Sequence, residues 1–186
     1  SFLMITDFSF PDNFVRLLGE PDVRTRFLRS LVYVFGSLLI AVPLGLGIAV
    51  WVNSLRGWKS STLQIVVLIP WVISMVVAAL LWRRVFAGQF NIASYLLELI
   101  GLRYRSPFDE PNLSMLVLVG VSAWRTIGYA MVMILAGLKG VPLELYEAAS
   151  VDGASKFRQL FSITLPLIRI PLTIVFVILT LSYFNV

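Results

Sequence analysis

Long runs without charged residues alternate with short polar segments along this chain. No charged residue occurs between Arg29 and Arg56, or between Lys59 and Arg83. A third run, from Leu113 to Leu138, contains a single charge, and a fourth extends from Ile170 to Val186. About 20 mostly apolar residues are enough for a helix to cross the hydrocarbon core of a bilayer. The pattern therefore predicts membrane-spanning helices at approximately residues 30–53, 62–82, 113–138 and 167–186.

The segments between the predicted spans differ in length and composition. Residues 54–61 form a short polar turn, and residues 139–166 form a long polar loop. Residues 83–112 include a predicted small amphipathic helix at Asn91–Ile100 and then a stretch rich in Pro, Asp and Asn. Residues 1–29 carry mixed charge and several turn residues. We expect them to lead in from an earlier helix, in a chain that is an internal piece of a longer protein.

Composition supports a membrane protein and limits its chemistry. Apolar residues make up 59% of the chain and charged residues 13%, whereas soluble domains average roughly 45–50% and 25%. The expected fold class is all-α, a polytopic bundle forming one transmembrane domain over residues 1–186. Without Cys or His, the chain lacks thiol nucleophiles, histidine bases and the usual ligands of zinc sites. We expect no metal, no cofactor and no nucleic-acid partner, since the net charge of +5 is scattered along the loops.

Prolines and basic residues add two expectations. Pro43 and Pro70 lie within the first two predicted spans and are expected to kink them. Residues 54–61 and 139–166 fall on one side of the membrane, opposite residues 1–29 and 83–112. The first side carries Arg56, Lys59, Lys139, Lys156 and Arg158, and the second carries Arg16, Arg24, Arg26, Arg29, Arg83, Arg84, Arg103 and Arg105. The excess of basic residues favours the second side as cytoplasmic.

The loop at 139–166 contains a predicted short helix. Pro142 suits the first turn of a helix, where its missing N–H costs nothing. The helix would extend over Leu143–Asp152, and Gly153 offers the left-handed conformation that ends it. Glu144 and Glu147 would share one face. The small side chains of Ala148 and Ala149 would let another protein approach the backbone closely, so this segment suits a groove with a basic rim.

The same loop carries a family resemblance. Residues 147–166 are EAASVDGASKFRQLFSITLP, and they resemble the conserved loop of permeases from binding-protein-dependent ABC importers. The matching positions are Glu147, Ala148, Ala149, Gly153, Ile163, Leu165 and Pro166. The segments PLELY at 142–146 and LIPW at 68–71, with Trp124, are similar to the sugar-transporting branch. The resemblance covers nearly the whole chain.

The resemblance implies a type I importer permease in a bacterial inner membrane. Its partners would be a second permease subunit, a cytoplasmic ATPase dimer, an extracytoplasmic solute-binding protein and a small solute, which we expect to be a sugar. The loop residues Glu144, Glu147, Ala148, Ala149, Gly153 and Pro166 would couple the permease to the ATPase. The chain has no phosphate-binding loop and no catalytic constellation, so ATP hydrolysis is assigned to other subunits. The resemblance places the 139–166 loop in the cytoplasm, opposite to the orientation that charge favours.

The third predicted span carries a polar stripe. Ser122, Arg125, Thr126 and Tyr129 fall at i, i+3, i+4 and i+7, on one side of a helix. Arg125 would lie roughly 18 Å deep, where a charge facing lipid costs from about 2.5 to more than 10 kcal/mol. The resemblance implies that these residues and Tyr183 line the solute path, where aromatic rings suit sugars. The alternative is that Arg125 pairs with a carboxylate or helix end of the partner permease.

Other solutes and another class of transporter stay open. The solute could be glycerol phosphate, a polyamine or a peptide, and a cationic Arg125 would suit an anionic solute. A self-sufficient channel or ion-coupled carrier would need an Asp or Glu within the membrane to bind its coupling ion. The predicted spans contain none, and the Glu-Ala-Ala loop has no role in such a protein.

Overall fold

The computed structural model describes residues 21–87, 91–101 and 106–185. Within these ranges the regular elements are all helical, which confirms the predicted all-α class. The first 20 residues of the predicted lead-in segment at 1–29 lie outside the described residues. So do Arg103 and Arg105 of the predicted basic side.

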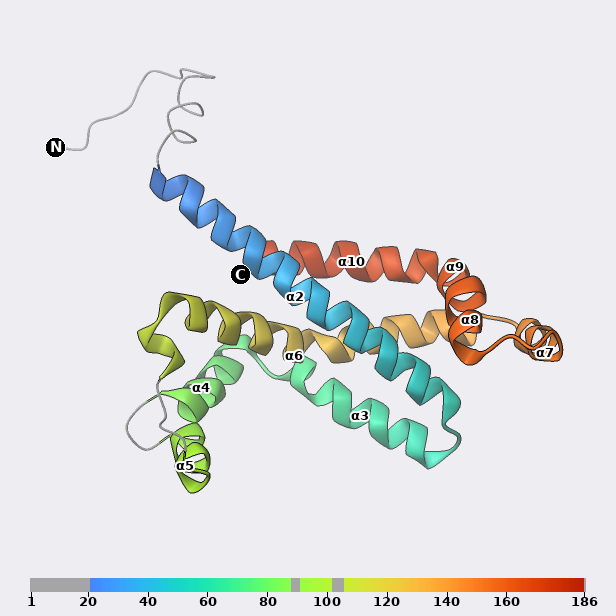
Figure 1. Ribbon diagram of the computed structural model, residues 1–186, viewed down its shortest axis with the longest axis horizontal. Coiled ribbons are helices and arrows are strands. Elements are labelled where there is room, and N and C mark those ends of the chain that lie inside the picture. The colour runs from blue at the N-terminus through green and yellow to red at the C-terminus, as the bar shows by residue number, and fades with distance from the viewer. Residues whose placement is uncertain (1–20, 88–90, 102–105, 186) are drawn as a thin grey trace, which may run out of the picture.

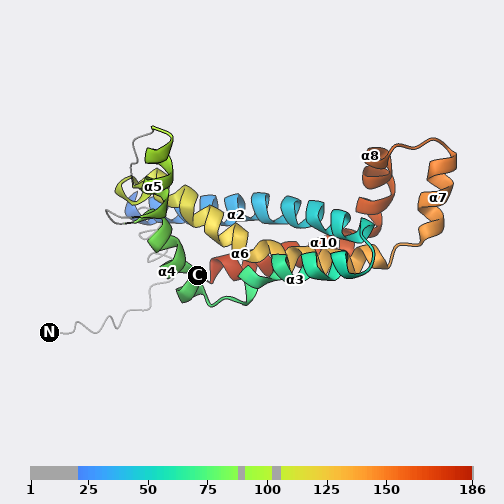
Figure 2. The same cartoon turned by 90° about the horizontal axis from the view of Figure 1, so that it is seen from below.

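Four helices extend side by side along the molecule, and the shorter elements lie at its two ends (Figures 1 and 2). The long elements are α2 (Pro21–Ser54), α3 (Trp58–Val72), α6 (Pro111–Lys139) and α10 (Arg169–Phe184). At one end lie α4 (Met75–Phe86), α5 (Ile92–Leu99) and a 3₁₀ turn at Pro107–Asp109. At the other end lie α7 (Leu143–Val151), α8 (Lys156–Gln159), a π-helical turn at Leu160–Thr164 and α9 (Leu165–Leu167). The helix predicted at residues 91–100 is confirmed as α5.

Helix α6 is the centre of the bundle, and small residues bring α2 against it. Ser37, Ala41, Gly45 and Ala49 recur at every fourth position of α2, and all of them are buried. A Cβ atom on Gly45 would lie only 2.7 Å from the Cβ atom of Ala130 on α6. Such rows of small side chains are typical of helix pairs in membranes, where close backbone approach replaces the hydrophobic driving force.

Two glycines of α6 allow α3 and α10 to approach its backbone closely. A Cβ atom on Gly128 would lie 2.4 Å from the carbonyl oxygen of Val67 in α3. A Cβ atom on Gly137 would lie 2.7 Å from Cγ of Pro171 in α10. Because glycine has no side chain at either position, α3 and α10 can both pack directly on the α6 backbone.

Within the described ranges, two helices are individually long and apolar enough to cross a membrane, at Asp22–Ser54 in α2 and Pro111–Lys139 in α6. The α6 helix agrees closely with the predicted 113–138. The α2 helix begins at Pro21 rather than near residue 30, because a helix can continue beyond its apolar stretch. The 34 residues of α2 extend about 51 Å, well beyond the roughly 30 Å of a hydrocarbon core.

Helices α3 and α4 together cover the second predicted span at 62–82, and the chain bends sharply between them, close to the kink expected at Pro70. Helices α3 and α4 meet at an angle of 94°, and Ile73 and Ser74 between them are extended. Pro70 lies in the last turn of α3 and cannot donate a backbone hydrogen bond. The predicted polar turn at 54–61 is also shorter than expected, because α3 already begins at Trp58.

The predicted span at 167–186 corresponds to α10, and the chain bends just before this helix begins. The helical segment Lys156–Leu167 meets α10 at 71°, and α10 begins at Arg169. Pro166 explains part of this geometry, because its ring crowds the preceding turn. The π-helical turn just before it widens the helix, and the N–H of Leu165 bonds to the carbonyl oxygen of Leu160. If each bent pair counts as one span, length and composition allow up to four spans in the described residues.

Candidate functional site

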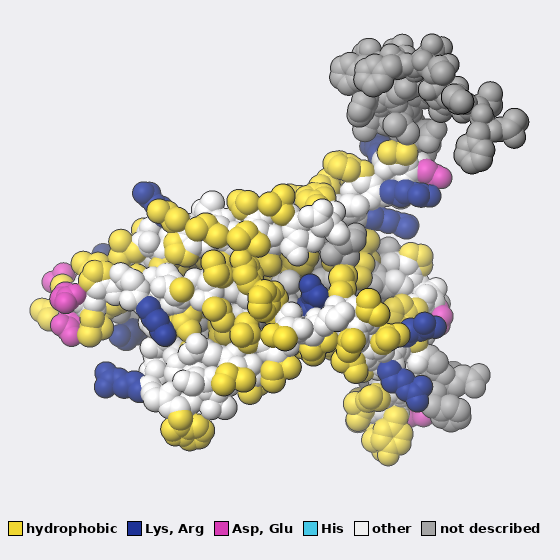
Figure 3. Space-filling view, turned by 180° about the vertical axis from the view of Figure 1, so that it is seen from behind, with side chains coloured by type: hydrophobic (Ala, Val, Ile, Leu, Met, Phe, Trp, Pro, Cys, Tyr) yellow, Lys and Arg dark blue, Asp and Glu magenta, His cyan; other side chains and the backbone are white. Residues whose placement is uncertain are grey.

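Helix α7 projects from one end of the helical bundle (Figures 1 and 2). None of its residues is buried, and Glu144, Glu147 and the following Asp152 are all exposed. These carboxylates have no ion-pair partner in the described part of the chain. Figure 3 shows acidic side chains gathered at this tip, with hydrophobic side chains over the middle of the same face. The tip therefore offers negative charge and an accessible helix to another molecule.

The backbone around α7 is close to the prediction. Gly153 adopts φ +74°, which confirms the predicted left-handed residue after the helix. Pro142 directly precedes α7 instead of lying in its first turn as predicted, because its extended ψ of 135° excludes it from the helix. Ala148 is exposed and Ala149 is half-buried.

Two side-chain contacts tie α7 to the segment that leads into α10. The Tyr146 hydroxyl and Thr164 Oγ1 share a hydrogen bond of 3.0 Å. Gln159 Nε2 donates to Ser150 Oγ at 2.9 Å and to the Ala154 carbonyl oxygen at 3.2 Å. Gln159 and Thr164 are both buried. Neither was predicted as a site residue, although each is a polar residue close to the apolar start of a predicted span.

The polar stripe of α6 divides between two sets of neighbours. On one edge, Ser122 and Thr126 are buried. Ser122 Oγ shares a 2.9 Å hydrogen bond with the hydroxyl of Tyr33 on α2, and Thr126 Oγ1 is hydrogen-bonded to the hydroxyl of Tyr183 on α10. The rings of Tyr33 and Tyr183 meet edge to face at 5.8 Å. These contacts join α2, α6 and α10, and Tyr33 was not predicted to take part.

On the other edge, Arg125 and Tyr129 are half-buried and lie toward α3 and α4. The ring of Tyr129 stacks on Trp71 of α3, with centroids 5.6 Å apart. One position before Arg125, Trp124 meets Trp82 of α4 edge to face at 5.4 Å. The stripe therefore contacts α3 through Tyr129, and its neighbour Trp124 contacts α4.

A cleft of about 320 Å³ opens between α2, α4, α6 and α10. Four of the residues predicted for the solute path line it, namely Ser122, Arg125, Thr126 and Tyr183, whereas Tyr129 does not. Aromatic residues Tyr33, Trp82 and Phe108 also contribute. Arg125 has no hydrogen bond or ion pair with any other described residue.

Solved structures identify the class of protein that this fold defines. The chain superimposes with a TM-score of 0.83 on a subunit of a bacterial ABC transporter that imports the acidic polysaccharide alginate, at 24% identity, covering 94% of this chain and 62% of that one. A second structure, an alginate ABC transporter in complex with a pentasaccharide-bound periplasmic protein, gives 0.81 at 25% identity, covering 90% and 59%. The fold is that of an ABC importer permease.

The family follows from the sequence match. Residues 25–185 match the model for the inner membrane component of binding-protein-dependent transport systems. The chain belongs to that family. This confirms the resemblance noted in the loop and in the surrounding sequence.

Individual relatives are sugar permeases. The chain is 29% identical to the trehalose/maltose transport permease of Thermococcus litoralis, over 94% of this chain and 59% of that protein. It is 31% identical to the arabinooligosaccharide permease of Bacillus subtilis, over 89% and 52%. It is 33% identical to the sulfoquinovosyl glycerol permease of Agrobacterium fabrum, over 92% and 55%. The chain thus spans little more than half the length of these relatives.

Proposed function

We propose that this chain forms part of the solute path of an ATP-driven importer and couples that path to a separate ATPase through α7. The observation that carries the proposal is α7 itself, an exposed acidic helix with the Glu-Ala-Ala sequence that projects from a membrane-length bundle. Its negative charge and small Ala148 side chain suit docking into a groove with a basic rim. The partners would be an ATPase dimer, a second permease subunit and an extracytoplasmic solute-binding protein, at a bacterial inner membrane crossed several times.

The contacts of α7 supply a route for coupling. Only residues 140–142 separate α6 from α7, so a displacement of α7 acts directly on α6. The Tyr146–Thr164 and Ser150–Gln159 hydrogen bonds attach α7 to the segment leading into α10. Helices α6 and α10 both line the cleft. Movement of the docked α7 would therefore shift two walls of the cleft together, as rigid-body alternating access requires.

We infer that the solute is a carbohydrate. The names of the relatives include trehalose, maltose, arabinooligosaccharides and sulfoquinovosyl glycerol, and the two solved structures described above are alginate transporters. The aromatic side chains of Tyr33, Trp82, Phe108 and Tyr183 line the cleft. Aromatic rings present the flat apolar surface on which the face of a sugar ring packs.

The experiment tests the coupling role of the loop in the assembled transporter. Glu147→Lys reverses the charge of α7, and Gly153→Val places a branched side chain at φ +74°, which is unfavourable by at least about 1 kcal/mol. Both variants should insert normally, lose solute uptake and fail to co-purify with the ATPase. Glu98→Lys is the matched control, because Glu98 is exposed on α5 at the opposite end. Normal uptake in both loop variants would overturn the proposal.

A further inference from the structure

We propose that the cleft between α2, α4, α6 and α10 recognises a solute bearing a negatively charged group, such as a carboxylate on a sugar ring. This inference rests on the proposed import function and names its substrate class. Among the residues that the structure describes, the guanidinium groups of Arg83 and Arg125 line the cleft and no Asp or Glu does. Such a cleft favours an anion over a neutral solute of the same shape.

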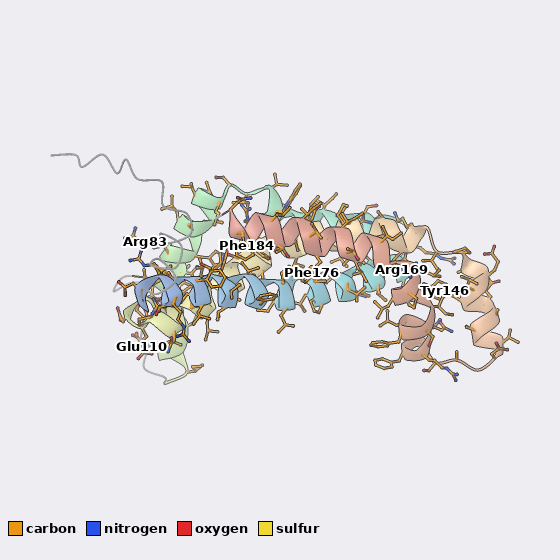
Figure 4. All side chains as sticks on the ribbon, turned by 90° about the horizontal axis from the view of Figure 1, so that it is seen from above. Arg83, Glu110, Tyr146, Arg169, Phe176 and Phe184 are labelled. Atoms are coloured by element: carbon orange, nitrogen blue, oxygen red, sulfur yellow. The ribbon has the colours of Figure 1, made fainter. Side chains whose placement is uncertain are left out.

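The two arginines lie on α4 and α6, next to a point where these helices contact each other. Trp82 on α4 and Trp124 on α6 are in ring contact, and each directly precedes one of the arginines in sequence. Arg83 is exposed at the α4 end of the molecule, as Figure 4 shows, whereas Arg125 is half-buried. A solute entering from that end would meet Arg83 first and Arg125 second.

Arg125 has an unmet electrostatic requirement within this chain. It lies in the middle of a membrane-length helix, where an uncompensated charge is costly, and it has no ion-pair partner among the described residues. The acidic residues closest to Arg125 in the preceding sequence are Asp109 and Glu110. They lie directly before α6 and do not line the cleft. A carboxylate accepts two parallel N–H bonds from a guanidinium, which makes it a well-matched ligand for this position.

The remaining walls of the cleft match a sugar ring. Its volume of about 320 Å³ lies at the lower end of the range for ligand pockets, roughly 300–1,000 Å³. Tyr33, Trp82 and Phe108 supply aromatic surface, and Ser114 and Ser182 supply hydroxyl groups. The combination of flat apolar surface, hydroxyl groups and cationic groups corresponds to a small acidic sugar.

The test uses the complete transporter in lipid nanodiscs, with a radiolabelled diuronide and the neutral disaccharide of the same linkage as probes. Binding of each probe is measured for the wild type, Arg125→Gln, Arg125→Lys and Arg83→Gln. We expect the wild type to prefer the diuronide by about tenfold, the ratio that one charge-assisted hydrogen bond supplies. Arg125→Gln should remove this preference by weakening diuronide binding alone, and Arg125→Lys should retain part of it. Arg84→Gln is the matched control, because Arg84 is exposed but does not line the cleft.

The other outcomes are equally decisive. Equal or better binding of the neutral disaccharide by the wild type would overturn the inference and leave the importer function intact. If Arg125→Gln depletes the assembled complex, the preference of Arg83→Gln for the diuronide over the neutral disaccharide becomes the test. A reduced preference in Arg83→Gln supports the inference, whereas an unchanged preference assigns Arg125 to pairing with the second permease. A transporter whose ATPase activity does not respond to its binding protein would overturn the proposed function itself.

Discussion

Ser37 shows how a single buried hydroxyl can be out of place in a well-packed interface. It lies in the small-residue row of α2 and is fully buried, and its Oγ atom is the buried side-chain oxygen without a partner among the described residues. Burying an unsatisfied hydroxyl costs about 1–3 kcal/mol. We therefore expect Ser37→Ala to leave the thermal stability of the assembled transporter unchanged or to raise it slightly.

Ser122 on the facing helix provides the matched comparison. Its hydroxyl is paired with Tyr33, so Ser122→Ala should strand the Tyr33 hydroxyl. The average hydrogen bond between membrane helices contributes about 0.6 kcal/mol, and we expect the melting temperature of Ser122→Ala to fall. If Ser37→Ala destabilised the transporter as much as Ser122→Ala, Ser37 would have a role that its contacts do not show.

The polar stripe illustrates what sequence could and could not predict at single residues. The spacing of Ser122, Arg125, Thr126 and Tyr129 correctly placed them on one side of a helix. Consecutive residues are about 100° apart around the axis, so Arg125 and Thr126 stand at opposite edges of that side. Each edge contacts a different neighbour, and Tyr183 lies 57 positions from Thr126 in sequence. Local spacing contains no information on partners that distant.

At the scale of elements, hydropathy predicted where apolar segments lie but not where helices break. Pro43 lies inside the continuous α2, whereas α3 ends just after Pro70. The difference is in packing. Ala41 and Gly45 on either side of Pro43 are buried against α6, whereas no residue of α3 is fully buried. Burial on both sides of Pro43 accompanies the unbroken α2, whereas the partly exposed α3 ends in the turn that follows Pro70.

The contact of α3 with α6 depends on Gly128. In a helix interior, Gly→Ala is normally stabilising by about 0.5–1 kcal/mol. Here the added Cβ atom would lie 2.4 Å from the Val67 carbonyl oxygen and 2.9 Å from Leu68 Cα. We expect Gly128→Ala to displace α3 and lower stability by about 1–3 kcal/mol, the usual cost of overpacking.

Thermal unfolding of the assembled transporter, followed by tryptophan fluorescence, measures this effect. Trp71 of α3 stacks on Tyr129, so displacement of α3 should also change the emission spectrum. Gly120→Ala is the control on the same helix, because nothing lies within 4 Å of the added atom. Equal stability of the two variants would contradict the close approach of α3 to α6.

At the scale of the whole molecule, the two ends have distinct roles in the proposed mechanism. The α7 end presents the acidic helix, and the α4 end opens into the cleft. Figure 4 shows this polarity, with Tyr146 and Arg169 at one end and Arg83 at the other. The alternation of spans and loops placed these segments on opposite sides. The count of basic residues, however, favours the α4 end as cytoplasmic, whereas the coupling role requires α7 to be there.

Single cysteines can decide this orientation, since the sequence contains no cysteine of its own. Val151→Cys lies at the exposed end of α7, and Asn112→Cys lies at the exposed start of α6. A membrane-impermeant maleimide should label Asn112→Cys in intact spheroplasts and Val151→Cys only in inverted vesicles. Leu39→Cys is the control, because Leu39 is 77% exposed midway along α2. In lipid its thiol would not ionise, so it should stay unlabelled from both sides. The reverse labelling of Val151→Cys and Asn112→Cys would place α7 outside the cell, where no ATPase could reach it. The basic loops, rather than the Glu-Ala-Ala helix, would then face the cytoplasm.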